Sequence, residues 1–330
     1  MSFTLLQAML FANCAFMYKT GVKSYSNYKI FSHPYLLGIC GDSGGGKTTI
    51  SSAIEGIFKE RNTTTIHGDD MHKWERGDEN WSRLTHLNPK SNFLHDEVSQ
   101  LKALKNNEMI KRRHYDHNTG KFTEKQEFSS NNLVIFEGLH SFYIKQMRDL
   151  YDLKIFVNPS EELRKFWKIA RDTKKRGYSK EKILQQMASR EQDSSKFIQT
   201  QAKYADIIIE LIADETIHNK SYDDENEDLN LTLKITANNS FYLEPLFAEL
   251  SQIDSLKSKH EYGEEDNQFI EVDGTISEQE LDLIAYRLLL SKELENLGIN
   301  DPLWNEGYTG IIQIFVAYCV LKNLEIEKTS

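Results

Sequence analysis

Apolar residues form short runs that alternate with longer segments of helical spacing between residues 35 and 212. The short runs are typical of buried strands and lie at 35–40, 63–67, 133–137, 153–157 and 205–211. The longer segments predict helices at 48–59, 92–105, 141–149, 159–175 and 180–191. This alternation predicts an α/β fold in which helices cover both faces of a mostly parallel sheet.

The pattern changes after an acidic run at 222–228, which we expect to form a solvated loop at the end of the first unit. A mixed α+β region follows. Its predicted strands lie at 229–235 and 269–272, and its predicted helices lie at 243–250 and 278–289. One further apolar segment lies at 311–321.

The first 18 residues carry no charge and are moderately apolar. A signal peptide would begin with basic residues, and a membrane span would need about twenty strongly apolar residues. Thr4, Gln7 and Asn13 dilute this stretch. We expect a helix that packs on the core or on a partner, with contact to a membrane as the weaker alternative.

The segment from Gly41 to Thr48 satisfies the pattern G-x-x-x-x-G-K-[ST] and stands between a predicted strand and a predicted helix. Its glycines let backbone N–H groups surround a polyphosphate, and the helix N-terminus adds a favourable dipole. We expect Lys47 to reach the β- and γ-phosphates and Thr48 to hold Mg²⁺. The expected nucleotide-binding residues are Gly41, Asp42, Ser43, Gly44, Gly45, Gly46, Lys47, Thr48 and Thr49. The chain is predicted to bind a nucleoside triphosphate.

Two acidic residues stand at or just after the ends of predicted strands, at the sheet edge where ligands bind in such folds. Asp69 comes after the second strand and is a candidate to accept a proton from a hydroxyl that attacks the γ-phosphate. Glu137 ends the third strand and is a candidate to organise Mg²⁺, often through water. A solvated acidic loop is the alternative for Asp69.

A basic face is predicted on the helix at 159–175, where Arg164, Lys168, Arg171 and Lys175 recur at spacings of four, three and four. An ordinary exposed helix has the same layout. Phosphoryl transfer requires cations that offset the charge on the transferring group. We expect Arg171 and Arg176 to supply this charge and Lys168 to lie nearer a substrate anion.

A further polar loop contains Tyr115 and His117, preceded by Arg112 and Arg113 and followed by a turn at 118–120. Its side chains suit contact with a sugar or a phosphate. A solvated turn explains the pattern nearly as well.

Composition narrows the classes of function. The 39% of hydrophobic residues suffices for a sizeable core, and the formal net charge of −10 argues against a nucleic-acid binder. Cys14, Cys40 and Cys319 show neither disulfide nor metal-site spacing, as expected in the reducing cytoplasm.

Together these motifs resemble the phosphoribulokinase and uridine kinase family of P-loop kinases, over about residues 35–212. Details are closer to phosphoribulokinases, because His72 and Gly120 stand where uridine kinases usually carry a tyrosine and a histidine. The matching segments are Asp69-x-x-His72-x-x-x-Arg76, Tyr115-x-His117-x-x-Gly120, Glu137-Gly138-Leu139-His140, Lys168-Ile169-x-Arg171-Asp172, Arg176-Gly177-Tyr178 and Tyr204-Ala205-Asp206.

The resemblance implies an ATP- and Mg²⁺-dependent kinase that phosphorylates a hydroxyl of a pentose phosphate, D-ribulose 5-phosphate foremost, to ribulose 1,5-bisphosphate. It implies Asp69 and Lys47 as catalytic residues, Glu137 and Thr48 at the metal, and Arg171 and Arg176 against the transferring charge. The residues implied to contact the sugar phosphate are His72, Arg76, Tyr115, His117 and Lys168. Relatives suggest a homodimer.

The same resemblance divides the chain into an N-terminal extension (1–34), a P-loop kinase domain (35–215) and a C-terminal region that completes the fold (216–330). Redox-active cysteines of photosynthetic relatives fall at Gly45 and His67, so control through that thiol pair is not expected. Open alternatives are a uridine or cytidine kinase, a kinase for another sugar or sugar phosphate in polysaccharide or nucleotide-sugar synthesis, and a nucleotide-binding regulator without phosphotransfer.

Overall fold

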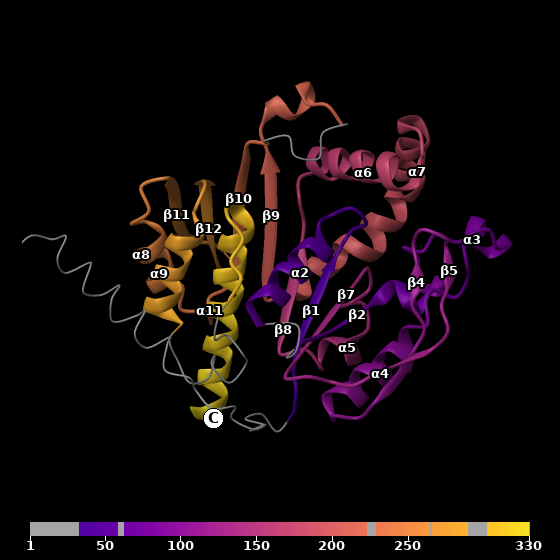
Figure 1. Cartoon of the computed structure of the whole chain (residues 1–330), viewed down its shortest axis with the longest axis horizontal. Helices are drawn as coiled ribbons and strands as arrows, with labels where there is room; N and C mark the ends of the chain where they lie inside the picture. Colours follow the sequence, from indigo (N-terminus) through magenta and orange to yellow (C-terminus); the bar gives the residue numbers. More distant parts are fainter. Residues whose placement is uncertain (1–32, 59–62, 223–228, 265, 290–301, 330) are drawn as a thin grey trace, which may run out of the picture. The chain divides into compact units, whose positions relative to one another are not determined.

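The computed structural model describes residues 33–58, 63–222, 229–264, 266–289 and 302–329. The helix expected in the first 18 residues and most of the acidic run lie outside these ranges. The described residues are organised around an eight-stranded sheet with the order β11-β12-β10-β9-β8-β1-β7-β2 (Figure 1). No described helix is long and apolar enough to cross a membrane.

Five strands form the parallel half of the sheet and confirm the predicted α/β fold. They are β2 (Thr63–His67), β7 (Leu133–Gly138), β1 (Tyr35–Gly41), β8 (Leu153–Val157) and β9 (Ile207–Ala213). Every residue of β1 and β7 is buried, because helices cover both faces of these central strands.

The remaining strands continue the same sheet in antiparallel pairing: β10 (Leu231–Asn238), β12 (Asn267–Gly274) and β11 (Leu256–Tyr262). Only β11 was not predicted. It is an edge strand with alternating polar residues such as Lys257 and Lys259, and it buries only its first residue fully, so its sequence lacks an apolar run.

One face of the sheet is covered by α2 (Lys47–Phe58), α8 (Glu244–Leu250), α9 (Glu278–Leu288) and α11 (Tyr308–Thr329), whose apolar residues share one core (Figure 1). All residues from 311 to 321 in α11 are buried. The polar exception is Gln313, whose amide donates to the carbonyl oxygens of Ala53 at 2.7 Å and Leu303 at 2.9 Å. The apolar segment predicted near the C-terminus is therefore a central core helix.

The opposite face packs against α4 (Leu94–Lys105) and α5 (Lys145–Arg148) around a second core. The predicted helix at 141–149 is wrong in length, because only one turn is α-helical. Two contacts hold the preceding residues out of a helix. The Ser141 hydroxyl donates to the Ile39 carbonyl at 2.8 Å, and the Phe142 amide donates to Gln201 at 2.9 Å.

Two longer helices, α6 (Glu161–Arg176) and α7 (Lys180–Asp193), follow β8 and lead into a π-helical turn at Ser194–Ile198 and a 3₁₀ helix at Gln199–Tyr204. Short elements between β2 and β7 surround the ends of the parallel strands. They are the 3₁₀ helices Gly68–Met71 and Pro89–Ser91, α3 (Glu79–Arg83), and the pairs β3 (Ile110–Arg112) with β6 (Gln126–Phe128) and β4 (Tyr115–Asp116) with β5 (Lys121–Phe122); a further 3₁₀ helix, Glu215–Asn219, follows β9.

Candidate active site

The predicted phosphate-binding loop joins the end of β1 to the start of α2. Gly44 and Gly46 have φ angles of +82° and +90°, a region that side chains rarely adopt, and a Cβ on Gly44 would lie 3.2 Å from the Cβ of Lys168. The Lys47 ammonium donates to the Asp42 carbonyl at 2.9 Å. The loop therefore has the strand, turn and helix context that a polyphosphate-binding loop requires.

The second residue of the loop links it to the basic helices. Asp42 is buried, and its carboxylate accepts hydrogen bonds from the Ser43 amide at 2.6 Å and from the Ser194 hydroxyl in the π-helical turn. The Arg164 guanidinium of α6 lies 3.5 Å from the same carboxylate. Of the other loop residues, Gly41 and Gly45 are buried, and Thr49 is exposed at the start of α2. The loop and α6 are thus held together through Asp42.

Thr48 and Glu137, the two predicted metal-site residues, are in contact. The Thr48 hydroxyl donates to Glu137 Oε1 at 3.0 Å. The Glu137 side chain is buried, and within the described residues its Oε2 atom has no hydrogen-bond partner. A buried carboxylate oxygen beside a P-loop threonine suits a hydrated Mg²⁺, which takes few protein ligands and completes its shell with water and phosphate oxygens. Among the described residues no cluster of three or more acidic, histidine or cysteine side chains offers a protein-only metal cage.

Asp69 lies in the 3₁₀ helix that follows β2, and two histidines face its carboxylate. His117 Nε2 lies 3.1 Å from Oδ2, and His72 Nε2 lies 3.5 Å from Oδ1. Burial raises the pKa of Asp69, but the hydrogen bond from His117 and the charges of His72 and His117 outweigh it and hold the pKa well below its ordinary value. Asp69 is consequently ionised at neutral pH and able to accept a proton.

The orientation of His72 is fixed by Asn92, a residue that the sequence did not single out. The Asn92 amide nitrogen donates to the carbonyls of His86 at 3.1 Å and Asn88 at 3.2 Å, so its Oδ1 atom is the acceptor for His72 Nδ1 at 2.7 Å. His72 therefore carries a hydrogen on Nδ1 and turns Nε2 towards Asp69.

The predicted cations of α6 meet at one buried carboxylate, Asp172. Its oxygens lie 3.2 Å from Lys168 Nζ, 2.8 Å from Arg171 Nε and 3.3 Å from Arg176 Nη1. The spacing also predicted Lys175 on this face of the helix. That prediction is wrong, because Lys175 is exposed to solvent. Burial raises the pKa of Asp172, but the three cations, Lys168 foremost, outweigh it and lower the pKa. Asp172 thus fixes three cations in one place.

Arg76 and Arg190 add to this positive charge. Burial lowers the pKa of Arg176; Asp172 opposes this shift, while the nearby guanidinium groups of Arg171 and Arg76 lower the pKa further. Arg190 of α7 lines a small, partly open hollow with Asp42, Arg164 and Lys168, among others, and makes no ion pair with a described residue. The sequence pattern did not indicate Arg190, since it stands alone on a helix of mixed charge.

The predicted substrate loop is the β4–β5 hairpin, and Arg76 holds its turn. The Arg76 guanidinium donates to the His117 carbonyl at 2.8 Å, and the Arg76 amide donates to the Gly120 carbonyl at 2.8 Å. Tyr115 is buried beside it. Burial raises the pKa of Tyr115, and the Arg76 charge opposes that rise. His117 and Tyr115 therefore lie close to Asp69, and Arg76 is tied to the same hairpin through His117.

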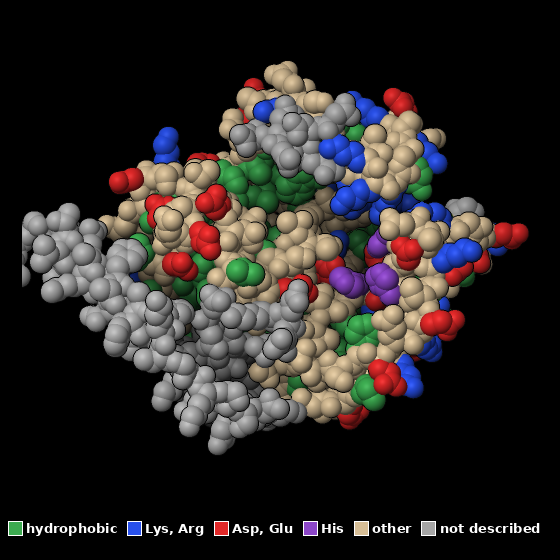
Figure 2. All heavy atoms as spheres, viewed as in Figure 1, with side chains coloured by type: hydrophobic (Ala, Val, Ile, Leu, Met, Phe, Trp, Pro, Cys, Tyr) green, Lys and Arg blue, Asp and Glu red, His purple; other side chains and the backbone are tan. Residues whose placement is uncertain are grey.

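Aromatic rings that the sequence did not indicate surround His72. Trp81 of α3 lies at stacking angles to His86 (26°) and Tyr115 (16°), with ring centroids 5.8 and 6.1 Å apart. His72 meets Trp81 and Tyr115 edge-on. In Figure 2 histidine side chains gather in a hollow below the basic side chains of the α6 and α7 region.

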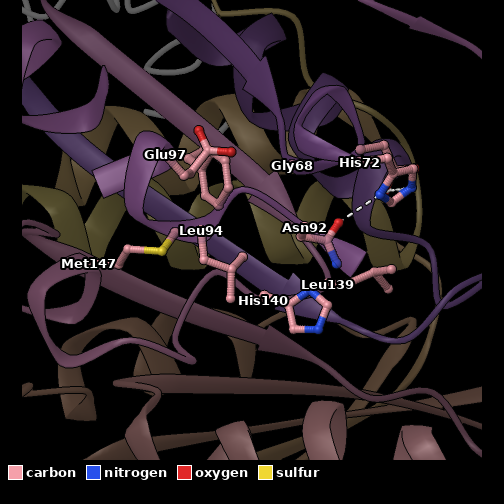
Figure 3. Close-up of a pocket in the computed structure, with 10 residues that line it drawn as sticks. Gly68, His72, Asn92, Leu94, Glu97, Leu139, His140 and Met147 are labelled. Atoms are coloured by element: carbon pink, nitrogen blue, oxygen red, sulfur yellow. Dashed lines mark hydrogen bonds and ion pairs between the residues drawn. The ribbon is translucent and has the colours of Figure 1, made fainter. Parts of the chain in front are cut away.

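Figure 3 shows a small cavity with His72, Asn92 and His140 on its wall, and Asp69 also lines it. The His140 ring nitrogen Nε2 lies 2.8 Å from the Leu87 carbonyl, and burial lowers the pKa of His140 to about 4. His140 is therefore neutral and supports the loop that carries Leu87.

Comparisons with known proteins agree with this geometry. The family model described as "Phosphoribulokinase / Uridine kinase family" matches residues 36–218. The chain is 34% identical over 185 residues to a phosphoribulokinase of Synechocystis sp., covering 56% of each protein, and 31% identical over 215 residues to the chloroplastic phosphoribulokinase of Spinacia oleracea, covering 60% of the chain and 53% of the relative. The chain thus spans about half the length of these relatives.

A uridine kinase of Listeria innocua is 30% identical over 183 residues, which cover 53% of the chain and 86% of that enzyme. In structure, the chain is similar to a phosphoribulokinase from Rhodobacter spheroides, with a TM-score of 0.59 and 21% identity over 81% of the chain and 99% of the neighbour. This structural likeness supports the fold. The chain belongs to the phosphoribulokinase / uridine kinase family.

Proposed function

We propose that this protein is an ATP- and Mg²⁺-dependent kinase that phosphorylates a hydroxyl of a pentose phosphate, with D-ribulose 5-phosphate as its acceptor. The observation that carries the proposal is the excess of positive charge around Asp172, whose cations lie within electrostatic reach of His86 and Tyr115, two neighbours of Asp69. Lys168, Arg171 and Arg176 share the single carboxylate of Asp172, and Arg190 lies close by without an ion pair among the described residues. Such an excess favours an acceptor that already carries a phosphate.

In the proposed reaction Asp69 accepts the proton of the attacking hydroxyl. The phosphate-binding loop and Lys47 hold the β- and γ-phosphates of ATP, and Arg171 and Arg176 offset charge on the transferring phosphoryl group. Thr48 and Glu137 would hold Mg²⁺, which neutralises phosphate charge when bound. Helices α6 and α7 supply these cations. Because the two helices also pack beside the phosphate-binding loop, they exclude water that would otherwise hydrolyse ATP.

The relatives named phosphoribulokinase support the choice of acceptor, and the relative named uridine kinase supports phosphotransfer to an alcohol more generally. One feature favours a nucleoside as the second candidate. The rings of Trp81, Tyr115 and His86 lie next to Asp69 and could stack against a pyrimidine.

Release of ADP at saturating MgATP distinguishes these acceptors. We expect turnover with ribulose 5-phosphate, and turnover with uridine or cytidine no higher than that of the Asp69→Asn variant. Turnover with a nucleoside alone would contradict the proposal. Equal turnover with both classes would show that the cations around Asp172 do not select the acceptor.

The proposal also predicts a pH dependence that originates in Lys168. Burial, helped by the charges of Arg171 and Arg190 and opposed by Asp172, lowers the pKa of Lys168 to about 8. The free enzyme therefore loses this positive charge above about pH 8. We expect kcat/KM for the sugar phosphate to fall above that pH, approaching tenfold per pH unit.

The Lys168→Arg variant keeps its charge at every accessible pH. Its kcat/KM profile between pH 6.5 and 9.5 should lack this decline, whatever its absolute value. A decline at the same pH in both proteins would show that another group is responsible.

A further inference from the structure

The proposed reaction assigns no role to His67, although its ring touches the predicted metal-site acid. His67 is the last residue of β2, and its Nδ1 atom lies 2.7 Å from Glu137 Oε1. Because Glu137 is a carboxylate acceptor, the ring nitrogen donates this hydrogen bond. The contact joins two strands that are far apart in sequence.

The sheet register brings the two side chains together. His67 and Glu137 are partner residues in the parallel pairing of β2 with β7. The residue that follows each of them is a glycine, and a Cβ on Gly68 would lie 3.1 Å from the Cα of Gly138. The strand ends therefore stay in close contact, and a side chain at position 67 lies beside the one at position 137.

The two carboxylate oxygens of Glu137 differ in their hydrogen bonds. Oε1 accepts from both His67 Nδ1 at 2.7 Å and the Thr48 hydroxyl at 3.0 Å. Oε2 is buried and lacks a hydrogen-bond partner within the described residues. A buried oxygen of this kind is costly unless a ligand satisfies it. With Oε1 occupied by two donors, Oε2 is the atom left for Mg²⁺ or for water in its shell.

We infer that His67 is a positioning residue for the metal site, which holds Glu137 Oε1 so that Oε2 faces Mg²⁺ or its bound water. This inference rests on the proposed Mg²⁺-nucleotide site. Residues outside the ligand set that orient a metal-binding side chain typically contribute about 10- to 100-fold to metal affinity. Since the His67 side chain is 38% exposed, we expect an effect near the lower end of that range.

Other groups that face His67 do not replace this contact. The His114 ring lies edge-on with its centroid 6.2 Å away. Burial lowers the pKa of His67, but the hydrogen bond and charge of Glu137, with smaller contributions from the charges of Asp70 and Asp69, outweigh it and raise the pKa. Asp70 itself is held at 3.1 Å by Arg112. In the described structure only Glu137 accepts a hydrogen bond from the His67 ring.

Three substitutions separate the hydrogen bond from the bulk of the ring. His67→Asn places an amide nitrogen near the position of Nδ1 and keeps the donor. His67→Gln carries its amide one bond further, near the position of Nε2, and His67→Leu has no donor. We expect all three to fold, because the side chain is partly exposed at a strand end; thermal unfolding without Mg²⁺ checks this.

The readout is binding of a fluorescent ADP analogue during a Mg²⁺ titration, which needs no turnover. We expect His67→Gln and His67→Leu to require about tenfold more Mg²⁺ than wild type for half of the Mg²⁺-dependent gain in affinity. His67→Asn should stay close to wild type, and affinity without Mg²⁺ should be unchanged in all variants.

Wild-type Mg²⁺ dependence in the Gln and Leu variants would overturn the inference, as would an equal loss in His67→Asn, which retains the donor. Wild-type protein that binds the analogue without any response to Mg²⁺ would instead contradict the proposed function. The two failures are thus distinguishable.

Discussion

Replacing Asp69 with asparagine is expected to lower kcat by about 10²- to 10⁴-fold, the usual contribution of a positioned general base, while affinity for ATP stays the same. The amide has nearly the shape of the carboxylate and can still accept the hydrogen bond from His117. It cannot accept the proton of the attacking hydroxyl. The check is to measure kcat together with the dissociation constant of ATP.

Asp70 offers the matched control because it is an adjacent carboxylate with a structural role. Its side chain is buried, pairs with Arg112 at 3.1 Å and accepts the Tyr115 amide at 2.8 Å. Both Asp70→Asn and Asp69→Asn should lower the thermal midpoint, because the pKa of Asp69 is also lowered in the folded protein, but only Asp69→Asn should lower kcat by this factor. Turnover of Asp69→Asn at a rate comparable with wild type would contradict the assignment of the base.

Replacing Asp172 with asparagine is expected to lower kcat by about 10²- to 10³-fold, as does removal of a group that stabilises transition-state charge. Lys168, Arg171 and Arg176 would lose their shared counter-charge and repel one another away from the transferring phosphoryl group. The KM for the acceptor should rise as well, since Lys168 is the cation expected to contact it.

Asp172→Asn should also change how the thermal stability of the protein depends on pH. The pKa of Asp172 is lowered in the folded protein, so its charge stabilises the fold above the unfolded pKa, and this contribution is lost as pH falls through the folded pKa. Asp172→Asn should therefore unfold at a lower temperature than wild type at pH 7, with a difference that shrinks in acid. Asp149→Asn, which removes an exposed pair with Lys145, is the control and should change neither property. A pH-independent difference would contradict this account.

The parallel half of the sheet followed from the sequence because its strands are buried on both faces and read as apolar runs. The observed bounds of β9 and β10 differ from the predicted ones by about two residues, because the hydrogen bonds between these two strands, and not hydrophobicity, determine where they begin and end. Strand β11 escaped prediction because an edge strand can be polar. The predicted helix at 141–149 was wrong because contacts to β1 and to the 3₁₀ helix at 199–204, which hydrophobic periodicity does not reveal, hold Ser141 and Phe142 in a turn.

The predicted site residues converge, because the motif positions stand at the ends of adjacent strands and on the helix that follows β8. What could not be predicted were the partners that orient them. Asn92, Asp172 and His67 act through hydrogen bonds to another residue of the site, and such pairings depend on the folded register. Trp81 and Arg190 reach the site from short or mixed-charge helices that give no periodic signal.

The most direct test of the central claim is to follow the products by phosphorus NMR when wild-type protein is mixed with MgATP and ribulose 5-phosphate. We expect one equivalent of a sugar bisphosphate for each ADP, with negligible inorganic phosphate. ADP accompanied by inorganic phosphate, or no ADP while uridine is phosphorylated under the same conditions, would contradict it.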